Sequence, residues 1–411
     1  MGKLLPAILV FLFSSDILRK RKKMKIVHIS PSAPYNEGWG YQENLLPKYQ
    51  AKLGHDVTLI VTNKEHFQGG FRVVEASDGY SKDGFRVIRR PVKSGFNLPL
   101  LRRFCMSRLD VYDLLCELQP DLIFYHGLAS ATIWQVVRYK KRVAPNVVLM
   151  QDNHLDYRIG PLDTLWRRFN ALRCAFVYRM TGRYVDKVWG VTPWRCRYAA
   201  EVYGVPKEKI GLLVMGGDDE KIKFDEASRL RKEIRAQLAI GENDFVVATG
   251  GKLDAAKNVH ILMRAFAKIK KDNLKLIVFG KPDDNLRHEI EALAQAPNIR
   301  YVGWIPADKV YDYFWASDLV AFPGQHSVLW EQACACGIPG IYKRWPGMDH
   351  VDVGGNVDYF EKDEEEEYRA KILASYENVE KYQAMKKVAL EKGIREFSYQ
   401  EIAKRATQIT C

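Results

Sequence analysis

Cysteine is scarce in this sequence, and no two cysteines have the spacing of a metal-binding pair. The seven Cys are scattered over 411 residues, and no Cys-x-x-Cys occurs. This pattern excludes a disulfide-stapled fold and indicates a reducing compartment. Cys334 and Cys336 lie close together, but no second His or Cys pair accompanies them. They are interpreted as packed thiols, and no metal site is expected.

Long hydrophobic runs are also missing. The longest apolar stretch, Leu4–Phe13, is shorter than the roughly 20 residues that span a bilayer, and no small-residue cleavage site of a signal peptide follows it. It belongs to an N-terminal extension, residues 1–23, that ends in a basic run. Two interpretations stay open. Either translation begins at Met24 and the start of this sequence is set too early, or the extension associates with a membrane.

Signatures of nucleic-acid binding are absent as well. The sequence has no zinc-finger spacing, no basic leucine-zipper heptads and no RNA-binding motif, so nucleic acid is not an expected partner. With 29 Gly and 17 Pro, the chain is neither collagen-like nor dominated by linkers. Its 47% hydrophobic and 27% charged residues are typical of a folded protein with room for two domains.

Positive charge is concentrated in the first half. Residues 1–200 hold 32 Lys and Arg against 16 Asp and Glu, a net charge of +16, whereas residues 201–411 hold 31 against 34, a net charge of −3. A basic half indicates contact with something anionic, such as a phosphate-bearing substrate or an acidic membrane surface. A solvated basic surface without a partner is the simpler alternative.

Short apolar runs alternate with helical stretches along the chain, which predicts an α/β protein of doubly wound parallel sheets. Strands are expected at 24–30, 55–63, 85–91, 121–127, 146–153, 186–192, 209–217, 244–251, 274–280, 299–304, 319–324 and 339–344. Helices of the second half are expected at 221–239, 257–271, 283–295, 306–316 and 328–336. The domains predicted from this pattern are 24–205 and 206–395, followed by a closing helix at 396–411.

One segment carries a pattern typical of phosphate binding. In it a strand ends in Gly250 and Gly251, Lys252 follows, and Lys257 lies where a helix begins. Glycines allow a close approach of backbone to ligand, and two lysines with a helix N-terminus supply positive charge. A diphosphate would fit there. A strand-to-helix turn with exposed lysines is the alternative that these residues alone leave open.

With the segments that follow, this one resembles the retaining glycosyltransferases of the GT-B fold, group 1 or family 4, which move a sugar from a nucleotide diphosphate sugar. The resemblance runs from Met24 to Ile409. The matching motifs are Gly250-Gly251-Lys252-Leu253 with Lys257, Phe279-Gly280, Gly303-Trp304, and Ala335-Cys336-Gly337-Ile338-Pro339.

The resemblance implies two Rossmann-like domains facing a cleft, with the closing helix packing back toward the first. It implies transfer of a sugar to a glycan or lipid-linked acceptor, with retention of configuration and with no cofactor other than the donor substrate. The sequence has no Asp-x-Asp metal motif between a strand and a loop, so no metal is expected. His126 matches the family's histidine beside the donor sugar, and Gly38 and Gly40 match its glycine-rich loop. Lys252 and Lys257 would meet the diphosphate charge in catalysis, and Gly280 belongs to the same donor site.

The sequence departs from the family at a pair of glutamates that contact sugar and ribose. In register, these positions hold Gly324 and Gln332. The hypothesis is that Glu331 or Gln332 holds the ribose and that His326 and Ser327 face the sugar and diphosphate. The alternative is a helix cap at Ser327 beside an incidental histidine.

A third strand end supplies candidates for the acceptor side, namely Asp152, Asn153 and His154. Two further functions stay open: a non-catalytic partner that binds sugar nucleotides, and a nucleotide-sugar epimerase or phosphorylase of the same fold. The expected location is the cytoplasm, with a peripheral position at the inner face of the membrane if the basic half contacts anionic lipid.

Overall fold

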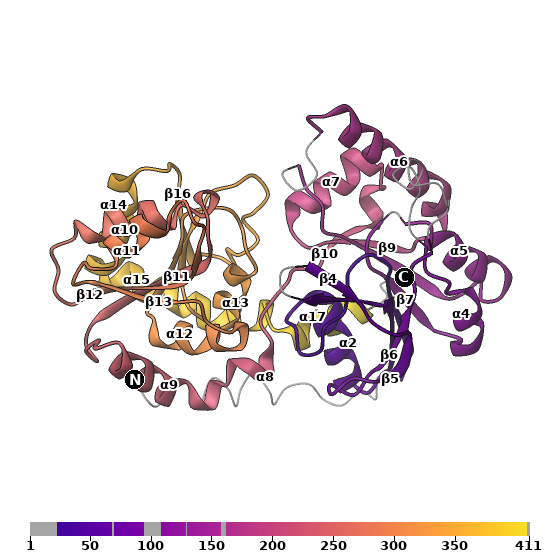
Figure 1. Cartoon of the computed structure of the whole chain (residues 1–411), viewed down its shortest axis with the longest axis horizontal. Helices are drawn as coiled ribbons and strands as arrows, with labels where there is room; N and C mark the ends of the chain where they lie inside the picture. The colour runs from indigo at the N-terminus through magenta and orange to yellow at the C-terminus, as the bar shows by residue number, and fades with distance from the viewer. Residues whose placement is uncertain (1–22, 68–69, 94–107, 129, 158–161, 409–411) are drawn as a thin grey trace. The chain divides into compact units, whose positions relative to one another are not determined.

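The computed structural model describes residues 23–67, 70–93, 108–128, 130–157 and 162–408. The N-terminal extension, residues 1–23, therefore lies, except for Lys23, outside the described residues. The chain forms two compact units (Figure 1). The first holds the chain up to Val191 and Arg195–Leu212, and the second holds Thr192–Trp194 and Leu213 onward. Each unit is described by itself.

The first unit is built on an eight-stranded sheet with the order β10-β9-β8-β7-β1-β2-β6-β5. All neighbouring strands are parallel except β5 and β6, which are antiparallel. The strands are β1 (Lys25–Ser30), β2 (Asp56–Thr62), β5 (Ser77–Tyr80), β6 (Arg86–Arg90), β7 (Leu122–Tyr125), β8 (Val148–Asn153), β9 (Lys187–Gly190) and β10 (Ile210–Leu212). A separate hairpin pairs β3 (Lys64–Phe67) with β4 (Gly70–Val73).

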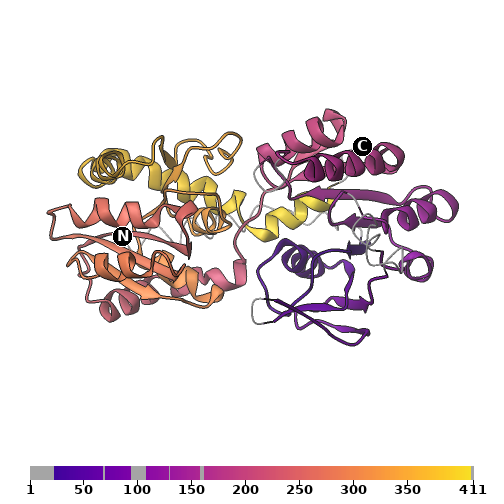
Figure 2. The same ribbon diagram turned by 45° about the horizontal axis from the view of Figure 1, so that its top comes forward.

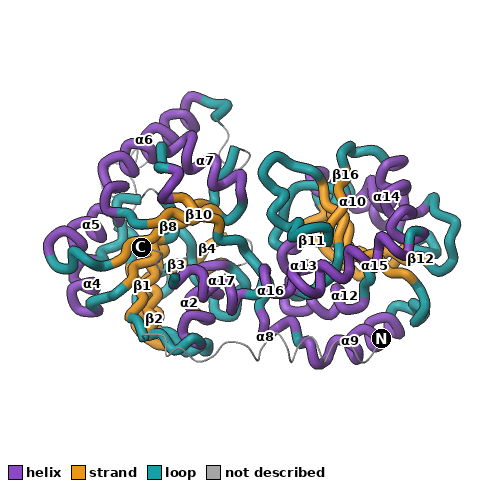
Figure 3. Tube along the Cα trace, turned by 180° about the vertical axis from the view of Figure 1, so that it is seen from behind, coloured by secondary structure: helices purple, strands orange, loops and turns teal. Residues whose placement is uncertain are grey.

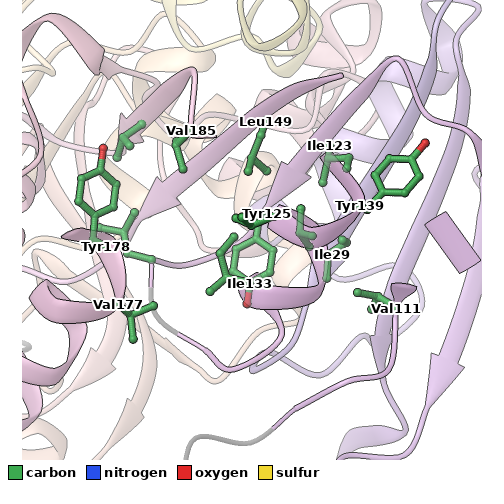
Figure 4. Close-up of a cluster of buried hydrophobic side chains, with 14 of the residues drawn as sticks. Ile29, Val111, Ile123, Tyr125, Ile133, Tyr139, Leu149, Val177, Tyr178 and Val185 are labelled. Carbon is green, nitrogen blue, oxygen red and sulfur yellow. The ribbon is translucent and has the colours of Figure 1, made fainter. Parts of the chain in front are cut away.

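Helices connect these strands and cover the sheet (Figure 3). They are α2 (Gln42–Lys52), α4 (Tyr112–Leu118), α5 (Ile133–Arg142), α6 (Leu165–Thr181) and α7 (Pro193–Tyr203). Alternate residues of the strands point to opposite faces. Ile29, Ile123 and Leu149 share a buried cluster with residues of α4, α5, α6 and α7 (Figure 4). The opposite face of β1 carries His28, which contacts Gln50 of α2.

The second unit is a six-stranded, fully parallel sheet with the order β13-β12-β11-β14-β15-β16. Its strands are β11 (Phe245–Leu253), β12 (Leu274–Pro282), β13 (Ile299–Gly303), β14 (Leu319–Phe322), β15 (Gly340–Lys343) and β16 (Val357–Phe360). The first strand of this unit lies in the middle, and the order reverses beside it. This is the doubly wound arrangement of nucleotide-binding domains.

Two helix layers enclose this sheet (Figure 2). The helices of the second unit as a whole are α8 (Asp219–Ile222), α9 (Ala227–Gln237), α10 (Val259–Ala267), α11 (Arg287–Leu293), α12 (Val310–Ala316), α13 (Leu329–Ala335), α14 (Glu365–Glu377), α15 (Val379–Val388), α16 (Ile394–Glu396) and α17 (Tyr399–Thr407). One buried cluster joins α10, α11 and α14 to Val247, Leu276 and Leu319. On the other face Phe279 packs against Phe314 of α12.

The α/β class and the doubly wound sheets predicted from the sequence are confirmed. The continuous helix expected over 221–239 is wrong. Lys223 adopts a left-handed φ of 54°, so α8 ends before it and α9 begins only at Ala227. The hairpin strands β3 and β4 and the edge strands β5 and β16 are not expected from the sequence, because each has only four residues and lacks the apolar run that marks a buried strand. Among the described residues, no helix has the length and apolar character to cross a membrane.

Candidate active site

The predicted donor residues of the second unit gather where its strand order reverses, between β11 and β14. Gly250, Gly251 and Lys252 end β11, and Gln325 and His326 follow β14. The chain continues from β11 into α10 and from β14 into α13, so the carboxyl ends of both strands lie at this reversal of the strand order. Open α/β sheets bind their ligands at this position.

Glycine is required at this sheet edge because the backbones are too close for a side chain. A Cβ on Gly250 would lie 2.4 Å from the carbonyl oxygen of Phe279, and one on Gly280 would lie 1.9 Å from the carbonyl oxygen of Gly251. Gly251 and Gly280 also have φ values of 109° and 132°, which disfavour other residues. The ends of β11 and β12 thus present bare backbone.

Lys252 projects from this edge. Its side chain is 65% exposed, and its Nζ lies 3.3 Å from Asp254 and 3.5 Å from Asp283. A hydrogen bond to Asp254 and the charge of Asp283 raise the pKa of Lys252. The ammonium group is therefore charged, accessible and held by weak contacts that an anionic ligand can replace.

Lys257 holds the loop that follows β14. Its Nζ donates to the carbonyl oxygens of Gln325, at 2.7 Å, and His326, at 3.0 Å. The loop packs so closely that a Cβ on Gly324 would lie 2.3 Å from the carbonyl carbon of Lys257. Gln325 completes the contact by donating its N–H to Ala256. The two lysines of the motif thus differ: Lys252 faces outward, and Lys257 fixes a loop.

A buried carboxylate lies behind this loop. Oε1 of Glu331, on α13, is 2.8 Å from Nε2 of His326 and 2.8 Å from Nε2 of His350. Burial raises the pKa of a carboxyl group, but the two histidines outweigh burial and hold the pKa of Glu331 well below its usual range. Its Oε2 is buried, with no hydrogen-bond partner among the described residues.

These three side chains are the one group of described residues whose chemistry and spacing would suit a metal ion, since their ligand atoms lie within 4.8 Å of one another. The two hydrogen bonds already account for the arrangement.

The cluster bears on the hypotheses for the helix after β14. Glu331 is fully buried and engaged by two histidines, whereas Gln332 is 9% exposed. Ser327 Oγ accepts from the N–H of Leu329, but the N-cap of α13 is Val328 and no side chain caps the helix, so the cap expected at Ser327 lies one residue before the helix cap of the structure. His326 is not incidental, because it anchors the loop to Glu331. Ribose binding by Glu331 or Gln332 stays a prediction, and the burial of Glu331 favours Gln332.

The first unit has its own point of strand reversal, between β1 and β7, and a chain of hydrogen bonds crosses it. Nδ1 of His126 lies 2.7 Å from Oδ2 of Asp152, and its Nε2 lies 3.1 Å from Nδ1 of His28. His28 Nε2 lies 2.6 Å from Gln50 Oε1, and Asp152 Oδ1 accepts from the N–H of Gly127. Both ring nitrogens of His126 are therefore occupied within the protein.

Burial and neighbouring charges determine which of these hydrogen-bonded side chains are ionised. Burial, with the neighbouring His126, lowers the pKa of His28 to about 3, so His28 is neutral at physiological pH. Burial alone would raise the pKa of Asp152, but His126 and His154 overcome it and lower that pKa below its usual range. Asp152 is thus an ionised carboxylate in the interior.

His154 is the exposed end of the same network. Its Nε2 lies 3.3 Å from Asp152 Oδ2, and 34% of its side chain is exposed. Burial lowers the pKa of His154, but attraction to Asp152, assisted by Glu43, prevails over burial and over repulsion from Arg195, so that the net shift is upward. Asn153 is instead used structurally, since its amide donates to the carbonyls of Leu155 and Arg195.

The glycine-rich loop after β1 is also in place. Gly38 has a φ of 75°, and a Cβ on either Gly38 or Gly40 would meet no atom within 4 Å. The loop is therefore open rather than tightly packed.

Family models match most of the chain. Residues 231–392 match the model described as glycosyl transferases group 1, and residues 45–221 match the model described as glycosyltransferase family 4. The chain belongs to the group 1 glycosyltransferases of the GT-B fold. The family predicted from the sequence motifs, and with it the enzyme class, is confirmed.

Solved structures share the fold of this glycosyltransferase. HepE from Anabaena, solved with UDP, is 19% identical with a TM-score of 0.65, covering 93% of this chain and 98% of HepE. A glycosyltransferase from Rickettsia africae ESF-5 is 12% identical with a TM-score of 0.65, covering 94% and 97%. A putative UDP-N-acetylglucosamine 2-epimerase from Listeria monocytogenes is 11% identical with a TM-score of 0.55, covering 94% and 95%. A comparison with curated protein sequences gave no match.

Sequence reasoning missed three residues that organise the glycosyltransferase's two clusters. His28 interrupts the apolar run of β1 at a position that faces away from the main core, and this is a signal that could have been used. Gln50 and His350 carry no such signal. Gln50 is one polar residue of a helix, and His350 lies in a loop 19 residues after Glu331, so only the folded chain brings them into contact.

Proposed function

We propose that this glycosyltransferase moves a sugar from a nucleotide diphosphate sugar to a glycan or lipid-linked acceptor, with retention of configuration and without a metal ion or other cofactor. One observation supports this proposal most strongly. The glycine backbone at the ends of β11 and β12, the exposed Lys252 and the loop held by Lys257 lie together where the strand order of the second unit reverses. The bound UDP of HepE, and the UDP-glucose in another HepE structure, support this class of donor.

The charge of the departing diphosphate is met by Lys252, which exchanges its contacts with Asp254 and Asp283 for phosphate oxygens. Lys257 stays on the carbonyls of Gln325 and His326 and adds positive potential beside the diphosphate. As the bond from the sugar to phosphate breaks, the acceptor oxygen attacks the same face of the sugar. The departing phosphate oxygen takes the acceptor's proton.

In the first unit, His154 is our preferred contact to substrate. The family resemblance assigns that role to His126, but both nitrogens of His126 are engaged by His28 and Asp152. His154 shares the same carboxylate and is partly exposed. His126 then acts as a positioning residue that, with His28, orients Asp152.

A product assay tests the proposed function. The full chain is incubated with a panel of nucleotide sugars, with and without lipid-linked and soluble glycan acceptors, in buffer containing EDTA. We expect nucleoside diphosphate to be released and a glycosylated product to form, and added Mg²⁺ to leave the rate unchanged. An epimerase would form an altered sugar without any acceptor, and a non-catalytic partner would bind donor and release nothing.

A further inference from the structure

Helix α6 exposes an apolar face that the fold of the first unit does not use. Its exposed large side chains are Leu165 (85% exposed), Trp166 (37%), Phe169 (45%), Leu172 (70%), Phe176 (60%) and Met180 (49%). Single exposed apolar residues are ordinary, but a contiguous patch of this kind marks an interaction surface.

The spacing makes this patch a stripe. Leu165, Phe169, Leu172, Phe176 and Met180 follow one another at intervals of four, three, four and four residues. At 3.6 residues per turn, they lie within an arc of about 80°. The residues that α6 buries, Cys174, Val177, Tyr178 and Thr181, lie on the opposite side. The helix is therefore anchored by one face and presents a second apolar face to solvent, over a length of about 25 Å.

The charged residues of α6 itself all have one sign. Residues 165–181 contain four arginines and no Asp or Glu. By the same helical geometry, Arg168 and Arg179 lie along one edge of the stripe and Arg173 along the other. Arg167 turns away and pairs with Asp163 at 2.7 Å. An apolar stripe bordered by arginines complements a bilayer, where acyl chains receive the apolar side chains and anionic headgroups receive the guanidinium groups.

A second copy of the chain fits this face poorly. A two-fold contact through α6 would place two helices of four arginines each, with no acidic residue on either, against one another. We propose that α6 lies in the surface of a membrane containing anionic lipid, with its stripe of Leu165, Phe169, Leu172, Phe176 and Met180 inserted among the lipids. The inference rests on the proposed function only in that a membrane position would bring the enzyme to a lipid-linked acceptor.

The test is sedimentation of the full chain with vesicles, without donor or acceptor. Phosphatidylcholine vesicles are compared with vesicles that also contain phosphatidylglycerol. We expect the wild type to bind the mixed vesicles, and Leu172→Ser/Phe176→Ser to reduce the partition coefficient at least about tenfold. Arg168→Gln/Arg179→Gln should also reduce it about tenfold and weaken its dependence on salt.

The matched control is Tyr80→Ser/Val379→Ser, which removes two equally exposed apolar side chains outside α6. It should bind as the wild type does, and circular dichroism should show all variants folded. Equal binding to both kinds of vesicle, or unchanged binding by the Leu172/Phe176 variant, overturns the proposal. Self-association that the Leu172/Phe176 variant abolishes would assign the face to a second copy and overturn it too. Because no sugar is present, these outcomes are independent of whether transfer occurs.

Discussion

Each unit of this glycosyltransferase contains a fully buried carboxylate that two histidines share, but the two clusters are completed differently. In the first unit, Asp152 engages His126 and His154 through one oxygen and the N–H of Gly127 through the other. In the second, Glu331 engages both histidines through one oxygen, and the other has no partner among the described residues.

This difference separates a cluster that reaches solvent from one that supports a loop. The Asp152 cluster crosses three adjacent strands and ends at His154, an accessible side chain that can carry charge toward a substrate. The Glu331 cluster is closed by His326 and His350, and its role is to hold the loop whose carbonyls receive Lys257. A carboxylate with two histidines thus reaches solvent in one unit, where we propose that it contacts substrate, and anchors a loop in the other.

Removing Asp152 should have the largest effect on stability. Asp152→Ala leaves the N–H of Gly127 and the ring of His126 without their buried acceptor. We expect the free energy of unfolding to fall by about 3–5 kcal/mol, measured by urea denaturation. Asp163→Ala is the control, since it breaks only an exposed pair with Arg167 and should leave the free energy of unfolding almost unchanged. A loss below about 1 kcal/mol for Asp152→Ala would contradict this account of the first cluster.

The corresponding change in the second unit should cost less. Glu331→Ala removes the acceptor of two histidines but deprives no backbone group of a partner, so we expect a loss of about 2–3 kcal/mol in the same measurement. It should also weaken nucleotide binding, because the loop at His326 loses its anchor. If Glu331→Ala proved more destabilising than Asp152→Ala, the account in which the first cluster contributes more to stability than the second would be contradicted.

The close packing of the loop after β14 can be tested at Gly324. A Cβ there would meet the backbone of Lys257 at 2.3–2.4 Å, so Gly324→Ala should cost about 1–3 kcal/mol. Gly40→Ala, in the open loop of the first unit, has no atom within 4 Å and should change stability by less than about 0.5 kcal/mol. Thermal unfolding of both variants measures the two losses of stability. Equal losses would contradict the close packing of the loop after β14.

The smallest expected effect is the pH dependence of the unfolding free energy that His154 contributes. Because folding raises the pKa of His154, its protonated form stabilises the native state. That contribution is fully present below about pH 6.5, the pKa of an unperturbed histidine, and is lost as pH rises through the folded pKa. The difference in unfolding free energy between the wild type and His154→Gln should therefore shrink from about pH 6 to pH 9. A difference that grows with pH would mean that His154 is held neutral.

The sequence predicted the sheets, and the position of the candidate donor residues at strand ends, better than it predicted the clusters. Apolar strand runs and glycines at strand ends are local signals, and β11 with Gly250, Gly251 and Lys252 lies where these signals place it. The distinct role of Lys257 was not evident, because its partners lie 68 and 69 residues away. His28, Gln50 and His350 depend in the same way on contacts that no local pattern records.

The central claim is that the reversal point of the second unit holds the donor's diphosphate, and nucleotide binding tests it most directly. The melting temperature of the full chain is measured with a panel of nucleoside diphosphates and their sugars. The comparison is with Lys252→Ala/Lys257→Ala and with the control Lys268→Ala/Lys271→Ala, whose lysines pair with surface glutamates. We predict stabilisation by one nucleotide in the wild type and the control, and its loss in the Lys252/Lys257 variant. Equal stabilisation of that variant, or no stabilisation of the folded wild type by any nucleotide, would contradict the account.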